Sequence, residues 1–466
     1  MKIGAPGFEP GTSASQTQRS NQAELRPDVH EMYGLQSPGA NSVLAMARIE
    51  PLRAVRYELA NAGPLERLIA PPYDVIDARA REELLARSHH NVVAIDLPQA
   101  ADGGDPYEAA HDIYAGWQRD GILVREQRPA LWALTQDYTG PDGRPHTRHG
   151  FLCRVRVEDY GAGRIRPHER THPGPKEDRL RLTRATRANL SPIFSLYPDP
   201  DQRAWAALEA GTEGAPRAEA RDGDGTLNRL WAIDDRGSIE AVQEALAERE
   251  LLIADGHHRY ETARAYAEEV GGEGDHRYVL MYLCSLADSG LTIFPTHRLL
   301  SGLDDARRAR LRETIERDFE VTPLASAAEL EPPADTPGVA FGYLDAEHAR
   351  PLRLTLRSQV VAATALAGRP EPFTRLDTAV LERIVLEGAL GMSEDDISHL
   401  HGLAYSKDFA DARAAVESGR AEAAFFMRAT PVEQVREVAA TGESMPPKST
   451  YFYPKVPTGL LFNPLD

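Results

Sequence analysis

The stretch Leu251-Leu-Ile-Ala-Asp-Gly-His-His-Arg-Tyr-Glu261 carries the most information in this sequence. Its first four residues are apolar and predict a buried strand, which ends at Asp255-Gly256. The Ala/Glu-rich segment from Glu261 to Val270 has helical character. We therefore predict a strand, a glycine turn and a helix that carries two histidines and an arginine at its start.

The predicted helix start is suited to an anion. First-turn N–H groups lack intrahelical partners, and the helix dipole places partial positive charge there. The guanidinium of Arg259 adds a planar fork that fits two phosphate oxygens. The alternative is an ordinary strand-to-helix connection with solvated side chains, which the crowding of polar residues onto one turn disfavours. The residues predicted to bind phosphate here are Asp255, Gly256, His257, His258 and Arg259.

Composition excludes several classes of partner. The chain of 466 residues is long enough for two or three domains. Its net charge of −18 argues against nucleic acid and anionic membranes as partners, so an anion site has to be local. No apolar run is long enough to cross a bilayer, and no signal-peptide pattern opens the chain. The only cysteines, Cys153 and Cys284, predict neither a disulfide framework nor a zinc site, which is typical of a cytoplasmic protein.

The first 45 residues differ from the rest of the chain. They are rich in Ser, Gln, Asn, Gly and Pro and lack apolar periodicity, so we expect residues 1–45 to be disordered. Gly7-Phe8-Glu9-Pro10 can be encoded by GGG-TTC-GAA-CCC, a self-complementary run like the T arm of a transfer RNA gene. We therefore expect the natural start at Met46, whereas the rival interpretation is a genuine flexible tail. Mass spectrometry of the native N-terminus distinguishes the two.

Strand and helix patterns mix along residues 46–466 without regular alternation, which predicts an α+β or mixed α/β fold. Extended or strand patterns cover residues 49–57, 92–97, 131–138, 149–157, 193–197, 251–254, 291–295, 338–344, 350–356 and 421–427. Helical patterns cover residues 78–88, 107–120, 176–189, 238–249 (with Ser238 as N-cap), 261–270, 304–319, 377–390 and 432–439. A long polar loop is expected over 164–175. We divide the chain into a main catalytic portion, 46–330, and a C-terminal α/β portion, 331–466, whose tail packs back on the site.

A second polar cluster precedes the predicted helix at residue 176. His168 or Glu169 could act as a general base, because burial can bring the pKa of either group near neutrality. Lys176 and Arg179 are three residues apart near the helix N-terminus, where positive charge opposes the dipole. A bound phosphate would remove that conflict. The alternative is a solvated basic face paired with neighbouring carboxylates.

Two further groups complete the candidate set. Lys448, Ser449 and Thr450 form a compact donor set in the proline-rich tail, although such aromatic tails often only close a core. Asp74, in a rigid proline-bounded turn, could abstract a proton or bind Mg²⁺, although lone acidic residues near turns are usually solvated.

A divalent metal site is a competing interpretation of the same residues. Adjacent histidines at a helix start point about 100° apart, so His257 and His258 would not readily chelate one ion. The arginine-rich surroundings suit an anion better than a lone cation. The side chains that could assemble such a site are His168, Glu169, His172, Asp255, His257 and His258.

Several blocks of this sequence resemble one family. They are Ala70-Pro-Pro-Tyr-Asp-Val-Ile76, Pro167-His-Glu-Arg-Thr171, Gly174-Pro-Lys-Glu-Asp-Arg179, Ala188-Asn-Leu-Ser-Pro-Ile-Phe194, Ala254-Asp-Gly-His-His-Arg-Tyr260, Pro295-Thr-His-Arg298 and Met445-Pro-Pro-Lys-Ser-Thr450. Together, and in this order, they resemble the bacterial and archaeal domain-of-unknown-function 1015 family from about Arg48 onward. Nothing in residues 1–45 belongs to that pattern.

The resemblance implies a fold and a chemistry. The family is similar to the ParB/sulfiredoxin-like superfamily, which implies a catalytic core of that type elaborated with a second α/β portion. Its relatives include nucleotide hydrolases and free-serine kinases, so the block from Asp255 to Arg259 is implied to hold phosphate. In the serine kinases an acidic residue N-terminal to this block is the base, and Asp74 and Glu169 are both candidates for that role.

We therefore expect phosphoryl transfer to a small hydroxyl-bearing metabolite, with free L-serine as the leading acceptor and ATP, ADP or pyrophosphate as donor. Mg²⁺ would bridge the phosphates, Lys176, Arg179 and Lys448 would offset charge, and His257 or His168 could shuttle a proton. A phosphatase or nucleotide hydrolase using the same site and a noncatalytic sensor of phosphorylated metabolites or nucleotides are the alternatives.

Overall fold

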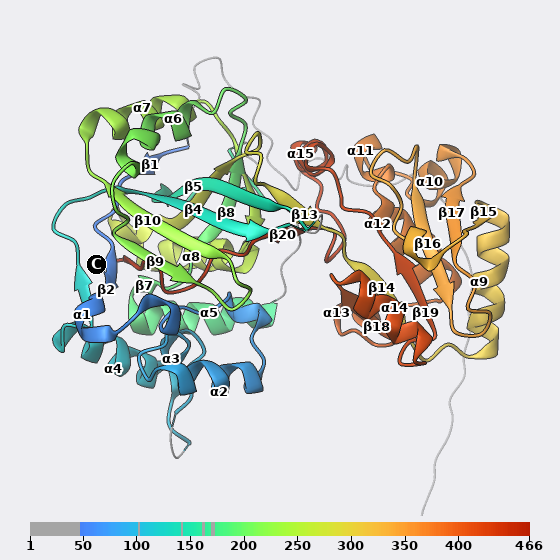
Figure 1. Cartoon of the computed structure of the whole chain (residues 1–466), viewed down its shortest axis with the longest axis horizontal. Coiled ribbons are helices and arrows are strands. Elements are labelled where there is room, and N and C mark those ends of the chain that lie inside the picture. The colour runs from blue at the N-terminus through green and yellow to red at the C-terminus, as the bar shows by residue number, and fades with distance from the viewer. Residues whose placement is uncertain (1–46, 101–102, 141–142, 161–163, 169–172) are drawn as a thin grey trace, which may run out of the picture. The chain divides into compact units, whose positions relative to one another are not determined.

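The computed structural model describes residues 47–100, 103–140, 143–160, 164–168 and 173–466 (Figure 1). The expectations for residues 1–45, and that for Glu169, lie outside the described residues. No helix among the described residues is long and apolar enough to span a membrane.

A nine-stranded mixed sheet, whose strands lie between Ile49 and Ser285, is the larger of the two main sheets. Its strand order is β6-β11-β8-β12-β5-β4-β10-β9, with β1 paired to β5. Most neighbours are antiparallel, but β11 runs parallel to β6 and β12 runs parallel to β8. In chain order the strands are β1 Ile49–Glu50, β4 Leu131–Thr139, β5 Pro145–Arg156, β6 Ile165–Arg166, β8 Ile193–Tyr197, β9 Ala218–Arg221, β10 Leu227–Ile233, β11 Leu251–Asp255 and β12 Tyr278–Ser285.

Both faces of this sheet are buried, and side chains alternate between them. Leu131, Ala133 and Ile253 lie in one core, whereas Trp132 and Leu134 lie in the other. Helices α6 Arg203–Glu209 and α7 Arg236–Leu246 cover the first face (Figure 1). Helices α3 Val93–Asp96, α4 Pro106–Arg119 and α5 Pro173–Thr186 contribute to the second core. Helix α8 His257–Val270 leaves the sheet directly after β11.

A second sheet is antiparallel and six-stranded, in the order β15-β17-β16-β19-β14-β18. Its strands are β14 His297–Leu300, β15 Phe319–Pro323, β16 Ala340–Asp345, β17 Leu352–Leu356, β18 Leu403–Ser406 and β19 Ala423–Phe426. The helices of this region are α9 Asp305–Asp318, α10 Gln359–Ala365, α11 Glu371–Thr374, α12 Asp377–Val380, the π-helix η8 Leu381–Ala389, α13 Glu394–Ser398, α14 Phe409–Glu417 and α15 Val432–Ala440. The division at residues 330 and 331 stays a prediction, although this sheet already includes β14 and β15.

The remaining strands form short pairs. They are β2 Val55–Tyr57 with β3 Leu123–Arg125, β13 Thr292–Phe294 with β20 Tyr451–Tyr453, and β7 Ala188–Asn189 with β21 Asn463–Pro464. The last two pairs attach the C-terminal tail to earlier parts of the chain. The other short helices are α1 Leu59–Ala62, α2 Ala78–Arg87, η2 Leu65–Arg67, η3 Tyr73–Val75, η5 Ala210–Thr212, η6 Asp275–Arg277 and η7 Ala327–Glu329.

The α+β class is confirmed, and the long helices predicted at 107–120, 304–319 and 432–439 match α4, α9 and α15 within two residues. The predicted strand at 92–97 is wrong, because these residues form helix α3. Asn91 explains the change: its Oδ1 accepts a hydrogen bond from the Val93 amide at 3.0 Å and starts the helical turn. A fully buried apolar run has no periodicity that separates strand from helix. The ParB/sulfiredoxin-like core stays a prediction.

Three predicted boundaries also need correction. The polar loop expected over 164–175 contains strand β6, and α5 begins at Pro173, before Lys176. The N-cap of α7 is Asp235 and not Ser238, because Asp235 Oδ2 accepts from the Ser238 amide at 2.8 Å. Helix α8 begins at His257, so the two histidines and the arginine lie at its start as predicted, although the Ala/Glu-rich pattern begins only at Glu261.

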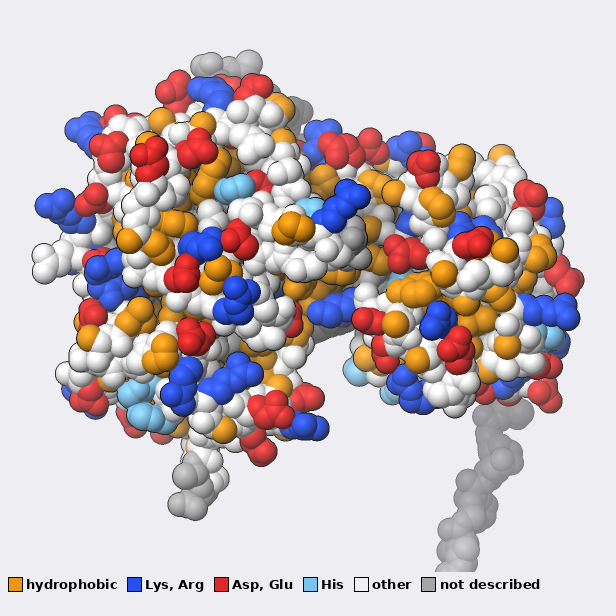
Figure 2. Space-filling model, viewed as in Figure 1, with side chains coloured by type: hydrophobic (Ala, Val, Ile, Leu, Met, Phe, Trp, Pro, Cys, Tyr) orange, Lys and Arg blue, Asp and Glu red, His pale blue; other side chains and the backbone are white. Residues whose placement is uncertain are grey.

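Charge is distributed over the surface without one dominant sign on the visible face. Acidic and basic side chains are interspersed there, with apolar side chains between them (Figure 2). A face of this kind lacks the broad basic patch that nonspecific binding to nucleic acid requires.

Candidate functional site

The turn between β11 and α8 has the geometry that the sequence predicts. Gly256 is the N-cap of α8 with φ 95° and ψ 31°, a left-handed conformation that favours glycine. A Cβ atom at Gly256 would lie 2.9 Å from Cζ and Nε of Arg259. The amides of His257, His258 and Arg259 occupy the first turn, where a helix supplies no backbone acceptors. The turn therefore presents N–H groups and the positive end of a helix dipole.

Asp255 holds two cations beside this turn. Its Oδ2 accepts from Nη2 of Arg259 at 2.5 Å, and its Oδ1 accepts from Nζ of Lys455. The side chains of Asp255, Arg259 and Lys455 are only 15%, 10% and 15% exposed. Burial raises the pKa of Asp255, but Lys455 and Arg259 outweigh it and hold that pKa below its usual range. Two positive charges face one negative charge, so the group keeps an excess positive charge.

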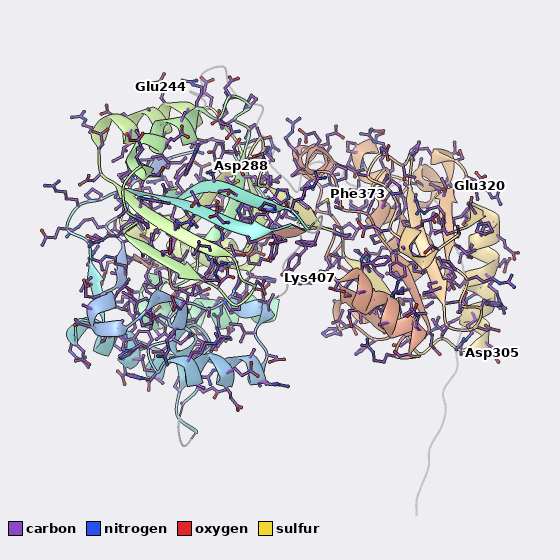
Figure 3. All side chains as sticks on the ribbon, in the orientation of Figure 1. Glu244, Asp288, Asp305, Glu320, Phe373 and Lys407 are labelled. Carbon is purple, nitrogen blue, oxygen red and sulfur yellow. The ribbon has the colours of Figure 1, made fainter. Side chains whose placement is uncertain are left out.

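Lys455 comes from the C-terminal tail. Burial opposes charge on this ammonium, yet Asp255, and more weakly Tyr451 and Asp74, raise its pKa. Its Nζ lies 4.6 Å from the ring centroid of Tyr451. On the same ring, Nζ of Lys407 lies 4.9 Å from the centroid (Lys407 is labelled in Figure 3). Lys455 therefore stays charged in a buried position.

His257 is a neutral hydrogen-bond donor in this arrangement. Its Nε2 accepts the backbone N–H of His168 at 3.2 Å, so in the neutral ring the proton resides on Nδ1. Burial, and then the neighbouring His168, lower the pKa of His257 well below its ordinary value. The ring is therefore uncharged near neutral pH. Its Nδ1–H group can donate a hydrogen bond to a phosphate oxygen.

His168 connects three segments. Its Nδ1 donates to the carbonyl of Ile253 at 2.6 Å, and its Nε2 accepts from Oγ1 of Thr450 at 2.9 Å. Its own carbonyl accepts from the amide of Met445 at 2.7 Å. Burial lowers the pKa of His168 to about 4. Both ring nitrogens are engaged, so this geometry gives His168 a positioning role, which differs from the proton shuttle expected from sequence.

Lys176 and Arg179 do not converge on one free space. Nζ of Lys176 forms an ion pair with Oε2 of Glu261 at 2.8 Å. Nη1 of Arg179 contacts Oδ1 of Asp96 at 3.1 Å, and its Nη2 contacts Asp178 at 2.6 Å. Helix α5 begins at Pro173, which places Arg179 in its second turn. Carboxylates therefore already offset both charges, as in the alternative interpretation of a paired basic face.

The donor set in the tail separates into different environments. Lys448 is exposed, whereas Ser449 is buried, and its Oγ donates to the carbonyl of Pro446 at 2.7 Å and lies 2.8 Å from Oγ1 of Thr378. Only Thr450 reaches the corner formed by β11, Gly256 and the start of α8, and it does so through its hydrogen bond to His168. Lys455 was missed by sequence reasoning. The available signal was a lysine among prolines and aromatic residues in a tail that otherwise resembles a core segment.

Asp74 is an exposed carboxylate in η3. Its negative charge contributes to the raised pKa of Lys455. Burial is the main cause of the raised pKa of Asp96, and the charge of Asp74 adds to that rise. Asp74 therefore lies close enough to the corner to act on it electrostatically. Its rival from the sequence, Glu169, falls outside the described residues.

The described residues contain no preformed cluster of metal ligands. Among them, no group of three or more His, Cys, Asp or Glu side chains is arranged to hold a metal ion. Both oxygens of Asp255 are occupied by Lys455 and Arg259, so this carboxylate is not available as a ligand. Mg²⁺ therefore stays a prediction without support from the described residues.

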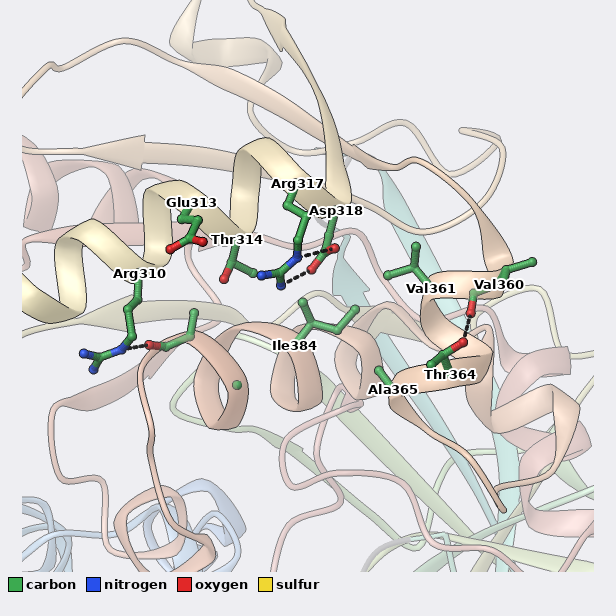
Figure 4. Close-up of a pocket in the computed structure, with 12 residues that line it drawn as sticks. Arg310, Glu313, Thr314, Arg317, Asp318, Val360, Val361, Thr364, Ala365 and Ile384 are labelled. Carbon is green, nitrogen blue, oxygen red and sulfur yellow. Dashed lines mark hydrogen bonds and ion pairs between the residues drawn. The ribbon is translucent and has the colours of Figure 1, made fainter.

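A groove of about 530 Å³ lies between α9, α10 and η8, far along the chain from the corner (Figure 4). Its polar side chains are mostly engaged with their own neighbours. Arg317 pairs with Asp318 at 2.7 Å, and Nε of Arg310 donates to the carbonyl of Ala389 at 2.9 Å. This groove gives no cluster of donors comparable to that at β11 and α8.

Several solved structures are similar to this chain at low identity. A conserved hypothetical protein from Pyrococcus furiosus is 18% identical, covers 64% of this chain and 92% of its own, and has a TM-score of 0.32. A free serine kinase variant in complex with ADP is 16% identical, with 64% and 89% covered and a TM-score of 0.34. C-terminally truncated SbnI from Staphylococcus aureus is 12% identical, with 66% and 85% covered and a TM-score of 0.34. These values are too low to carry function over.

The search of curated proteins gives no match. A family model described as "Protein of unknown function (DUF1015)" matches residues 49–379. The match includes β11, the glycine turn and α8, and it covers more than half of the sequence. The chain therefore belongs to the DUF1015 family.

Proposed function

We propose that the corner formed by β11, Gly256 and α8 binds the phosphate of a donor, and that the protein transfers this phosphoryl group to a small hydroxyl-bearing metabolite. Free L-serine is the leading acceptor, and ATP, ADP or pyrophosphate is the donor. The observation that carries the proposal is a pair of ion pairs, called the clamp, in which Arg259 and Lys455 both contact Asp255 beside the helix N-terminus.

The clamp supports anion binding because it fixes the donors in advance. The shared carboxylate holds both cations in place, so ordering them costs little when a ligand arrives. The first-turn amides of α8 and Nδ1–H of His257 add neutral donors. Phosphoryl transfer depends mainly on positioning and on stabilising charge on the phosphoryl oxygens, which such a set provides.

The proton on the acceptor hydroxyl needs a base. In our proposal Asp74 accepts it, the hydroxyl oxygen bonds to the transferred phosphorus, and the bond from that phosphorus to the donor's bridging oxygen breaks. Asp74 fits this role because its carboxylate is exposed, whereas His168 has no ring nitrogen left to accept a proton. Glu169 is the alternative base.

The direct test incubates the purified protein, as the full chain and as the chain that begins at Met46, with L-serine and each of the three donors. Phosphorus NMR and mass spectrometry then measure O-phosphoserine. We expect product with at least one donor and none without protein. Absence of O-phosphoserine with every donor would remove the serine kinase proposal.

A noncatalytic sensor is the second candidate, and one observation favours it. The carboxylate of Asp255 and the imidazole of His168 are both engaged in internal contacts, which favours a role in ligand binding over a role in catalysis. Titration calorimetry that detects tight binding of a nucleotide or pyrophosphate without turnover would support the sensor. Release of phosphate from O-phosphoserine would instead identify a phosphatase that uses the same donors.

A further inference from the structure

Lysine is rare in this chain, which uses arginine for most of its positive charge. Five of the 53 basic side chains are lysines, and those within the described residues are Lys176, Lys407, Lys448 and Lys455. Lys455 contacts Asp255 on β11, Lys176 pairs with Glu261 on α8, and Lys448 belongs to the same C-terminal tail as Lys455. The fourth of these lysines, Lys407, comes from a different part of the fold.

Lys407 lies between β18 and α14, in the region of the second sheet, yet its side chain contacts the tail (Figure 3). Its Nζ donates to Oη of Tyr451 at 3.3 Å and lies 4.9 Å from the centroid of that ring. Tyr451 is itself held by the antiparallel pairing of β20 with β13, where it lies opposite Phe294. The ring of Tyr451 therefore holds the Lys407 ammonium against the tail.

The same ring brings the ammonium groups of Lys407 and Lys455 close together. Nζ of Lys455 lies 4.6 Å from the centroid of Tyr451, so the two nitrogens are at most 9.5 Å apart. Two charge-assisted hydrogen bonds of about 2.8 Å each take up more than half of that separation. Two linked phosphate groups cover the remainder while one of them occupies the corner.

No carboxylate among the described residues offsets the charge of Lys407. The side chain is exposed and forms no ion pair there. The adjacent Asp408 is engaged elsewhere, because its Oδ1 accepts from the amide of Asp411 in the first turn of α14. The hydroxyl and ring of Tyr451 are neutral partners, so the full positive charge of Lys407 remains for an anion.

We propose that Lys407 binds the second phosphate group of a donor whose first phosphate group occupies the corner, so that the site selects anions with two or more linked phosphates. This inference rests on one part of the proposed function, the binding of phosphate at the corner, and it requires neither the acceptor nor the transfer step. A compact ammonium with three rotatable donors suits the position, because it binds phosphate as a point charge. The second sheet then takes part in recognition of the donor.

Titration calorimetry of the full chain with pyrophosphate and, separately, with orthophosphate tests this proposal. We expect the wild-type protein to bind pyrophosphate more tightly than orthophosphate. Lys407→Met should weaken pyrophosphate binding at least about tenfold, through loss of one charge-assisted hydrogen bond, and change orthophosphate binding by less than about twofold. Because Lys407 is exposed, we expect the fold to be retained, which circular dichroism verifies.

Arg420→Met is the matched control. It removes one positive charge from an exposed side chain beyond the other end of α14, where Arg420 pairs with Asp411 at 3.1 Å. We expect it to leave the affinity for both anions unchanged. Unchanged pyrophosphate binding in K407M, equal weakening of both anions in K407M, or the same loss in R420M would overturn the role of Lys407. A wild-type protein that binds neither anion would instead refute the phosphate corner, and with it both proposals.

Discussion

The ammonium of Lys455 hydrogen-bonds to Oδ1 of Asp255, although 200 residues separate them in the chain. The tail is fixed on both sides of this contact. Thr450 binds His168 before it, and the backbone of Thr458 exchanges hydrogen bonds with that of Ala70 after it. The C-terminal tail is therefore a structural part of the phosphate corner.

Replacement of Lys455 tests this ion pair. Lys455→Met leaves the carboxylate of Asp255 buried with only Arg259 as a partner. We expect the free energy of unfolding to fall by about 1–3 kcal/mol, because Oδ1 of Asp255 loses its hydrogen-bond partner in a buried position. Denaturant titration followed by circular dichroism measures this change.

The matched control is Lys448→Met, a lysine of the same tail that is exposed. We expect it to change the free energy of unfolding by no more than about 0.5 kcal/mol. Similar losses in the two variants would show that the tail responds to any loss of charge, and the specific pairing would be refuted.

Gly256→Ala tests the close approach of Arg259 to the turn. The added Cβ would lie 2.9 Å from the guanidinium, so Arg259 has to move. We expect affinity for pyrophosphate, measured by titration calorimetry, to weaken at least about tenfold. Gly271→Ala at the other end of α8 is the control, because its φ is also positive but no atom lies within 4 Å of the place that its Cβ would take. An unchanged affinity in G256A would argue against Arg259 as a ligand.

Buried histidines predict a pH dependence of stability. The folded pKa of His168 is about 4, below the unfolded value of about 6.5, so between these values the unfolded chain binds the proton more readily. The free energy of unfolding should therefore rise with pH across this window, by roughly 3 kcal/mol from His168 alone. His297, whose pKa burial also lowers to about 4, adds to the same trend.

Denaturant titrations at pH 4.5, 5.5 and 6.5 measure this dependence, and His168→Gln isolates one contribution. We expect the variant to be less stable at pH 6.5 but to lose less of its stability on acidification. A wild-type protein whose stability stays constant across this window would contradict the burial of neutral histidines.

Asp74→Asn tests the assigned base. The substitution preserves size and removes the proton-accepting carboxylate, so we expect kcat for phosphoserine formation to fall about 10²–10⁴-fold with little change in donor affinity. Asp77→Asn is the control, because Asp77 caps α2 through Oδ1, a role that asparagine fills equally well. Full activity in D74N would move the base role to Glu169.

Part of the fold was predictable because its signals are local. The apolar run of β11 indicated a strand, and the helical pattern at 107–120 indicated α4, which Gly121 follows at φ 68°. Helix α3 was mistaken for a strand because all four of its residues are buried, so no polar face marks its period. Strand β6 was missed because two residues carry no pattern.

The site was predictable to a similar extent. The block from Asp255 to Arg259 is contiguous, so one turn brings it together. Asp96 and Lys455 were not selected, because nothing near them in the sequence shows that they pair with Arg179 and Asp255. The pairing of Lys176 with Glu261 and of Arg179 with Asp96 was not predicted for the same reason.

The sequence by itself determined the strand, the glycine turn and the helix start, since backbone conformation there depends on neighbouring residues and on glycine's access to positive φ. Tertiary structure alone decided which charges are paired and which polar atoms remain without partners. Electrostatic pairing and burial depend on distances between segments far apart in the chain, and residue spacing does not encode those distances.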